Sequence, residues 1–241
     1  MKPQLIDTAL DSRTDAEGKD PDIASPTLRE YHRLLWSKAL PGGEVFDLNT
    51  SRPRAYLHHK SDLGEFFLSS DTVVPTFRSY RRMATIIDQI PTAELDEFQL
   101  LNHTIGGALV FPGERREGTQ TINQARGRNG QIADRLDLTL EAIRLHYAGE
   151  PNILSKSLTA YDDFFRLFAT FKGYVDFFLL QDAVSANYGS VEFFLPADEP
   201  AMRALPTDVK MWRFYRDRAT AFVKARNRRI DNWARVNLGD A

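Results

Sequence analysis

The sequence contains no cysteine among its 241 residues. This absence excludes disulfide bonds, thiolate nucleophiles and zinc sites with cysteine ligands, and it removes a common sign of secretion. A long hydrophobic run is also missing, because no stretch approaches the ~18 apolar residues of a membrane-spanning helix. The N-terminal residues are polar and acidic and lack the apolar core of a signal peptide. We therefore expect a soluble, cytoplasmic protein without a membrane partner.

An excess of charge of either sign is missing as well. The chain has 31 Lys and Arg against 33 Asp and Glu, a formal net charge of −2, which neither predicts nor excludes a nucleic-acid partner. The 42% of hydrophobic residues are enough to form a full core in a chain of this length. No repeat, low-complexity tract or linker divides the chain. We expect an acidic, partly extended N-terminal segment over residues 1–24 and a single domain over residues 25–241.

Short β-branched or aromatic runs are typical of strands, and they gather in the first half of the chain. Three of them cover residues 44–48, 55–59 and 64–69, with short polar or Pro/Gly-containing connections between them. A fourth run, over residues 104–110, contains two adjacent glycines that allow a bulge or a close backbone approach. These patterns predict one mostly antiparallel sheet, with the run at 191–195 as a further edge strand.

Apolar residues at helical spacing dominate the second half of the chain. The spacing predicts helices over residues 26–36 and 77–90 in the first half, and over 131–147, 157–184 and 207–235 in the second half. Gly173 is predicted to divide the fourth of these into two helices. That region is rich in aromatic residues, and those expected in the core are Phe164 or Phe165, Phe168, Phe171 and Phe178. The fold class is therefore α+β: a small, mostly antiparallel sheet in the first half, packed against helices that dominate the second half.

The segment TINQARGRNG, residues 121–130, has the composition of an anion-binding loop. Glycines let a backbone approach a ligand, and the guanidinium groups of Arg126 and Arg128 can bind phosphate or carboxylate. Asn123 and Asn129 would orient the ligand, and the following helix offers free N–H groups. The segment is neither a Walker loop nor a dinucleotide fingerprint.

A structural interpretation of the same segment remains open. In it, the segment is a surface loop whose arginines pair with acids such as Asp134 or Asp137. If Arg126 instead points into a binding cavity, it needs a nearby acid when no ligand is bound, and Asp134 and Asp176 are the candidates.

Two histidines on a predicted strand are candidates for acid–base catalysis. Side chains alternate along a strand, so only one of His58 and His59 can face a cleft, and the pair makes a poor metal site. Lys60, at the end of the strand, would add a ligand contact. The alternative is a histidine that serves packing or hydrogen bonding.

Other polar groups have simpler structural interpretations. Ser70 and Asp71, at the end of a strand, either form a polar site or cap the next element of the chain. Three acids on the helix predicted after residue 131 could bind a divalent cation or form a solvated face, and we favour the solvated face; they are Asp134, Asp137 and Glu141. No metal site is therefore predicted.

The predicted C-terminal helix is strongly basic. Its nine cationic residues are Lys210, Arg213, Arg216, Arg218, Lys224, Arg226, Arg228, Arg229 and Arg235. A basic stripe of this kind fits nucleic acid or an acidic protein. It could also hold the acidic N-terminal segment of the same chain, and we favour this second interpretation.

Several long phrases of the sequence resemble an uncharacterised bacterial family, a domain of unknown function. They are KDPD with SPTLREYHRLLWSK (19–38), YLHHKSDLGEFFLSSD (56–71), TIGGALVFPG (104–113), TINQARG (121–127), IADRLDLTLEAIRLHY (132–147) and GYVDFFLLQD (173–182). The resemblance covers most of the chain after residue 18. It implies a bacterial, cytoplasmic protein and supplies no activity and no catalytic residues.

The sequence leaves two functional hypotheses. The first is a protein or enzyme that binds a phosphate-bearing, nucleotide-like small molecule at a site around residues 121–130. The second is a non-enzymatic module that binds nucleic acid or an acidic protein through the basic helix at 207–235. The sequence predicts neither a cofactor nor an oligomeric state.

Overall fold

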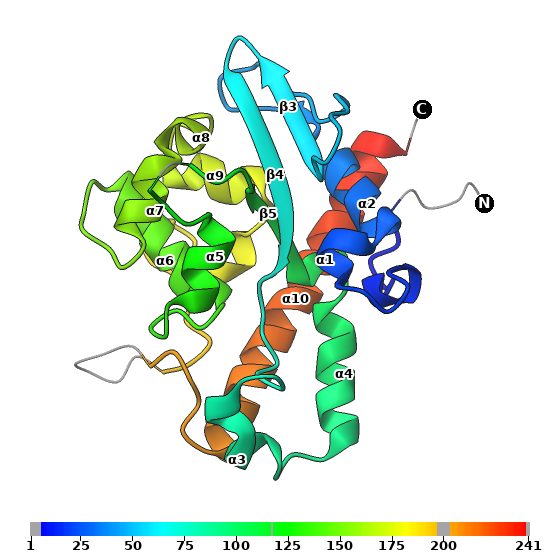
Figure 1. Ribbon diagram of the computed structural model, residues 1–241, viewed down its shortest axis with the longest axis vertical. Coiled ribbons are helices and arrows are strands. Elements are labelled where there is room, and N and C mark those ends of the chain that lie inside the picture. The colour runs from blue at the N-terminus through cyan, green and yellow to red at the C-terminus, as the bar shows by residue number, and fades with distance from the viewer. Residues whose placement is uncertain (1–5, 117, 197–202, 240–241) are drawn as a thin grey trace.

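The computed structural model describes residues 6–116, 118–196 and 203–239 of the chain, and its fold is α+β. A three-stranded antiparallel sheet lies at its centre, in the order β3 (Leu57–Ser61), β4 (Gly64–Thr72) and β5 (Ala108–Pro112). Figure 1 shows the long strand β4 crossing the middle of the molecule, with α5 to α9 on one side and α1, α2, α4 and α10 toward the other. The predicted strands at 55–59 and 64–69 are thus confirmed as a hairpin.

The other strand predictions are only partly correct. Of residues 44–48, only Val45–Phe46 (β2) form a strand, and they pair with Lys38–Ala39 (β1) in a separate two-stranded sheet. The reason is local: the turn between these strands folds the chain back, and the Leu40 N–H donates to the Glu44 carbonyl. The run at 191–195 contributes only a single bridge, from Val191 to Val184, so the predicted edge strand is wrong.

The fourth predicted strand begins later than expected. Ile105–Gly107 form a 3-10 turn (η3), and β5 starts only after it. Two close approaches explain the turn. The Gly106 N–H donates to Asn227 Oδ1 at 2.8 Å, and a Cβ on Gly107 would lie 2.1 Å from the Asn102 carbonyl oxygen. The two glycines therefore admit neighbouring backbone, which is the second of the roles expected for them.

The helical segments of the first half are short. They are η1 (Ser12–Asp15), α1 (Pro21–Ala24), α2 (Pro26–Trp36), η2 (Arg81–Met83), α3 (Ala84–Ile87) and α4 (Thr92–Asn102). The described part of the N-terminal segment therefore contains helical turns and is less extended than predicted. The helix predicted over 77–90 is confined to 81–87, since Phe77 takes a left-handed backbone conformation with φ of 62°. Helix α4 has no counterpart among the predictions.

The helical segments of the second half form most of the mass around the sheet. They are α5 (Ile122–Arg128), α6 (Leu136–Tyr147), α7 (Ser155–Ala160), α8 (Asp162–Arg166), α9 (Phe171–Phe177), η4 (Gln181–Ala183) and α10 (Val209–Leu238). The predicted break at Gly173 is wrong, because this glycine lies inside α9. A Cβ there would lie 2.1 Å from the Phe168 carbonyl oxygen, so the glycine lets α9 pack against the turn before it.

The core is one continuous cluster that joins the sheet to both groups of helices. All the phenylalanines expected in the core are buried, and the most exposed of them, Phe171, shows only 7% of its surface. Along α10, Trp212, Tyr215 and Phe222 are buried as well, and this helix packs against α4 and η3. In the described part of the chain, no helix is long and apolar enough to cross a membrane.

Candidate functional site

Residues 121–128, predicted to be a loop, begin with a helix cap. The Thr121 side chain accepts a hydrogen bond from the Gln124 N–H, and α5 follows directly. The two sides of this short helix have different surroundings. Arg126 is buried against the end of β4, whereas Arg128 is exposed. The arginines predicted to act together are thus separated by the helix.

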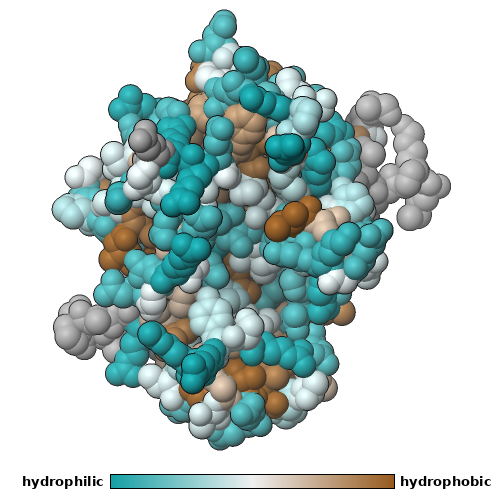
Figure 2. Space-filling view, in the orientation of Figure 1, coloured by the Kyte–Doolittle hydropathy of each residue, from teal (hydrophilic) through white to brown (hydrophobic). Residues whose placement is uncertain are grey.

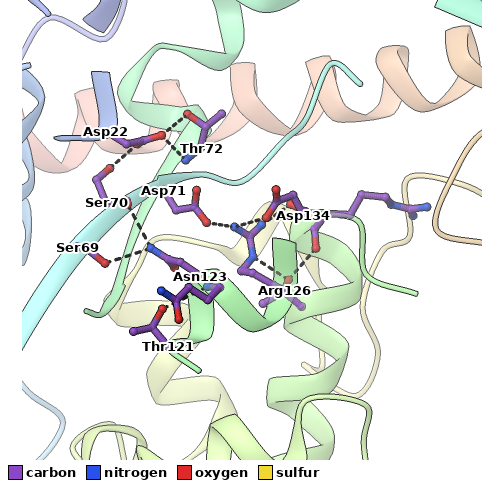
Figure 3. A network of polar contacts seen from close by, with 12 residues as sticks. Asp22, Ser69, Ser70, Asp71, Thr72, Thr121, Asn123, Arg126 and Asp134 are labelled. Carbon is purple, nitrogen blue, oxygen red and sulfur yellow. Dashed lines mark hydrogen bonds and ion pairs between the residues drawn. The ribbon is translucent and has the colours of Figure 1, made fainter. Parts of the chain in front are cut away.

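Arg126 is fully buried and fully partnered. Its guanidinium donates to Asp71 Oδ2 and to the backbone carbonyl of Asp134, and its Nε donates to Thr139 Oγ1 at 3.1 Å. The Asp134 carboxylate lies 3.5 Å away. Figure 3 shows the guanidinium between these two acids. One side chain therefore ties α5 to β4, to the turn before α6 and to α6 itself, which is a structural role.

Of the two acids proposed to support Arg126, only Asp134 does so. Asp176 lies on α9, where it pairs with Lys172 and accepts hydrogen bonds from Gln181 and Tyr188. Asp176 thus stabilises its own helix and the turn after it.

The N-terminal segment joins the same polar region through Asp22. Its carboxylate accepts hydrogen bonds from Ser70 Oγ at 2.7 Å and from the Thr72 backbone N–H and hydroxyl, both at 2.9 Å. Asn123 on α5 donates to Ser69 Oγ at 3.1 Å and to the Ser70 carbonyl at 3.2 Å (Figure 3). Ser70 and Asp71 therefore cap no helix; they join distant segments. We call this set the Arg126 network: Asp22, Ser69, Ser70, Asp71, Thr72, Asn123, Arg126 and Asp134.

The network holds three carboxylates and one guanidinium, which pairs with Asp71 and Asp134 but not with Asp22. Burial raises the pKa of Asp71 to about 8, and the charges of Asp22 and Asp134 act in the same direction against that of Arg126. Burial also raises the pKa of Asp22. Within residues 6–116, 118–196 and 203–239, no group of three or more His, Cys, Asp or Glu could hold a metal ion. The other two acids considered for a cation point elsewhere, since Asp137 pairs with Arg135 and Glu141 with Arg144.

His32 borders the network and was not singled out from the sequence, where it lies within the apolar stripe of a helix. The Trp36 indole N–H can only donate, and it lies 3.0 Å from His32 Nδ1. His32 Nε2 must then carry the proton and donate to Ser70 Oγ, 3.1 Å away, which in turn donates to Asp22. A histidine that donates to the serine cannot act as its base, so this arrangement does not form a nucleophilic serine.

The burial of His32 makes stability depend on pH. Burial, with the nearby charge of Arg226, lowers the pKa of His32 from 6.5 to about 3, so the folded protein holds this ring neutral. The associated stability is complete above pH 6.5 and is lost as the pH falls toward 3. Between pH 7 and pH 5 we expect this histidine alone to remove about 2 kcal/mol from the free energy of unfolding.

The measurement is urea denaturation of the wild type and of His32→Gln at both pH values. The variant should be less stable at pH 7 but should lose about 2 kcal/mol less on acidification. Equal losses in the two proteins would show that His32 titrates normally.

The contacts of His58 and His59 lie within the fold. They occupy opposite faces of β3, as predicted, but both are buried. His58 Nε2 lies 2.9 Å from Glu65 Oε1, while His59 stacks on Phe46 and its Nδ1 lies 2.9 Å from the Asp47 carbonyl. Lys60 is exposed and pairs with Glu65. None of these three residues lines the cleft beside α5.

That cleft, of about 470 Å³, lies on the exposed side of α5. It is bounded by residues 115 and 118–120, by the end of α5 and by residues 153–157. Its described lining contains three cations and no acid; the residues are Arg115, Gly118, Thr119, Gln120, Ala125, Arg128, Asn129, Ile153, Leu154, Lys156 and Ser157. We call it the basic cleft. Of the predicted ligand-binding residues, Arg128 and Asn129 line it, whereas Asn123 and Arg126 belong to the Arg126 network.

The basic residues of α10 are largely occupied within the fold. Arg226 is buried and donates to the carbonyls of Gly106, Ala108 and Phe178. Five others pair with acids: Arg213 and Arg216 with Glu94, Arg218 with Glu192, Arg229 with Asp182, and Arg235 with Asp231. None of these acids comes from the N-terminal segment, which docks on β4 through Asp22. The expectation that the N-terminal segment pairs with the basic residues of α10 is therefore wrong for these arginines.

Comparison with known proteins agrees with the resemblance seen in the sequence. Residues 6–230 match the model of a family of unknown function (DUF6994), and the chain belongs to this family. No curated protein and no solved structure matches it. Family membership assigns no activity, so function has to come from the chemistry of the site.

Proposed function

We propose that this member of a family of unknown function binds a phosphate-bearing small molecule in the basic cleft. The observation that carries the proposal is the convergence of Arg115, Arg128 and Lys156 on one concavity whose described lining has no acid. The resemblance of the sequence implies a bacterial, cytoplasmic protein, and we keep that setting as part of the proposal.

The cations of the cleft differ from Arg126 in their partners. Arg126 meets two acids, whereas Arg128 and Lys156 make no ion pair with any residue that the structure describes. Arg115 donates to the Thr119 carbonyl at 3.1 Å. Like charges held near one another repel, and a bound anion removes that repulsion. A phosphate is the anion that best matches a guanidinium fork beside an ammonium point charge.

Neutral groups of the cleft complete the set that a phosphate ester needs. Thr119 and Ser157 bring hydroxyls, and Asn129 brings an amide. Apolar side chains at the other wall, including Ile153, suit the uncharged part of a ligand. The described lining contains no His, Asp or Glu, so the proposal is one of binding and includes no catalytic step.

The Arg126 network supports this site from the opposite side of α5. It fixes the helix to β4 and α6, and thereby holds Arg128 and Asn129 at the mouth of the cleft. Arg126 and Asn123 accordingly position the site without contacting the ligand.

The test is calorimetric titration of inorganic pyrophosphate and ATP into the wild type, Arg128→Gln and Lys156→Gln. Each variant loses one charged contact, worth roughly 1.5–3 kcal/mol, so affinity should fall about ten- to a hundredfold. Arg166→Gln is the matched control, because this arginine on α8 is exposed and does not line the cleft. Unchanged affinity in both cleft variants, or no binding of either ligand by the wild type, would refute the proposal.

A further inference from the structure

A second cleft adjoins the basic cleft and differs from it in chemistry. It measures about 310 Å³ and is lined mainly by aliphatic side chains of α6 and of the connection to α7, including Leu138, Leu145, Pro151 and Ile153. The one acid of its described lining, Glu141, is paired with Arg144. We call it the apolar cleft. Figure 2 shows hydrophobic side chains gathered over the α6–α7 connection, at the left of the view.

The two clefts share a wall. Ile153 lines both clefts. Asn152, just before it, lines the apolar cleft, and Leu154, just after it, lines the basic cleft. On the opposite side, Asn129 borders the basic cleft and Gln131 the apolar one. A single ligand can therefore occupy both by passing over Ile153. Together the clefts lie within the roughly 300–1,000 Å³ typical of small-molecule sites.

Ile153 itself is an unusual residue for a solvated ridge. It is 47% exposed and is one of few large apolar side chains so exposed in the described chain. A ligand whose apolar part covers this side chain removes apolar surface from water, which favours binding. The arrangement indicates a ligand with a charged end and an apolar end.

We propose that the ligand is a nucleoside phosphate whose phosphates bind in the basic cleft and whose base lies in the apolar cleft. This inference rests on the proposed function and extends it by naming the substrate class. The base fits better than an alkyl chain because two amides, Gln131 and Asn152, stand at the rim of the apolar cleft. The Gln131 side chain has no hydrogen-bond partner among the described residues, and an amide offers both a donor and an acceptor to a base edge.

Three probes separate the parts of this proposal. Inorganic pyrophosphate tests the basic cleft alone, the four common nucleoside diphosphates test both clefts, and hexyl phosphate tests an aliphatic occupant. Each is titrated by calorimetry into the wild type, Leu145→Gln and Leu100→Gln. Leu145 is half-buried in the apolar cleft, whereas Leu100 lies on α4, away from both clefts, and controls for the same substitution on a helix.

At least one nucleoside diphosphate should bind the wild type about tenfold more tightly than pyrophosphate, because burial of the base adds apolar contact. Leu145→Gln should remove this gain and leave pyrophosphate affinity unchanged, while Leu100→Gln should alter neither. Thermal denaturation confirms that both variants are folded. If Leu145→Gln proves unfolded, Gln131→Ala replaces it, with loss of the preference among bases as the expected result.

The outcomes distinguish the two proposals. Pyrophosphate binding without any gain for a nucleotide overturns the inference and leaves the proposed function standing. A larger gain for hexyl phosphate than for every nucleotide also overturns it, in favour of an aliphatic group. Failure of all probes to bind the wild type overturns the proposed function, and the inference falls with it.

Discussion

Replacing Arg126 with alanine is expected to lower the free energy of unfolding by about 3–5 kcal/mol, because three acceptors inside the fold lose their donor, at roughly 1–3 kcal/mol each. The arginine is completely buried and donates to Asp71, to the Asp134 carbonyl and to Thr139. Its removal leaves these acceptors unpaired and removes the guanidinium that balances the carboxylates of the network. Urea denaturation at pH 7.5 measures the loss.

Arg128→Ala is the matched control, since it removes the same side chain two residues later on the same helix. Arg128 is exposed and has no ion pair with a described residue, so the change should stay within about 0.5 kcal/mol. Arg126→Lys keeps the charge but loses the planar fork, and its stability should fall between the other two. Equal stability of Arg126→Ala and Arg128→Ala would contradict the structural role.

Lysine variants of the two arginines distinguish a residue that stabilises the fold around the cleft from one that contacts the ligand. Arg126→Lys should melt at a lower temperature than the wild type and still bind pyrophosphate with unchanged affinity, whereas Arg128→Lys should show the opposite pattern. A loss of affinity in Arg126→Lys at a temperature where it is fully folded would place Arg126 in the ligand site after all.

The sequence allowed the prediction of an α+β fold because most of its hydrophobic patterns are long enough to distinguish a helix from a strand. The hairpin of β3 and β4 follows from alternating apolar residues, and α10 from a long helical repeat. The two-residue strand β2 is too short for its pattern to show which strand it pairs with. The turn after Leu40 decides that, by folding the chain back onto β1.

The helix α5 was missed because its glycine and asparagine residues are typical of loops. Gly127 costs a helix about 1 kcal/mol relative to alanine. A side chain at this position would, however, place its Cβ 3.1 Å from the Asp134 carboxylate. The glycine thus serves the approach of Asp134 to Arg126, a tertiary reason that local patterns cannot reveal. The Thr121 cap was the available signal for a helix.

The sequence indicated several residues of the candidate site but not how they are arranged in space. Arg126 and Asp134 are close in sequence, and their contact was among the possibilities. Asp71 lies 55 residues from Arg126, and Asp22 lies 48 residues from Ser70, so nothing local joins them. The side of α5 on which each arginine lies follows from helical geometry, but only once the helix itself is recognised.

Replacing Phe168 with alanine is expected to lower the free energy of unfolding by about 3–5 kcal/mol, the range for truncating a buried phenylalanine. Its side chain is fully buried, and its ring centroid lies 5.0 to 5.4 Å from those of four other aromatic residues. These are Phe164, Tyr174, Phe177 and Phe178.

The truncation leaves a cavity that these rings cannot fill, because they are held by separate helical segments and by the close contact of Gly173 with the Phe168 carbonyl. Phe214→Ala is the control: this phenylalanine on α10 is 40% exposed, and its truncation should cost no more than about 1 kcal/mol. Phe168→Leu, which keeps most of the volume, should lie between the two. Urea denaturation of the three variants measures the series, and a Phe168→Ala protein as stable as Phe214→Ala would remove this ring from the core.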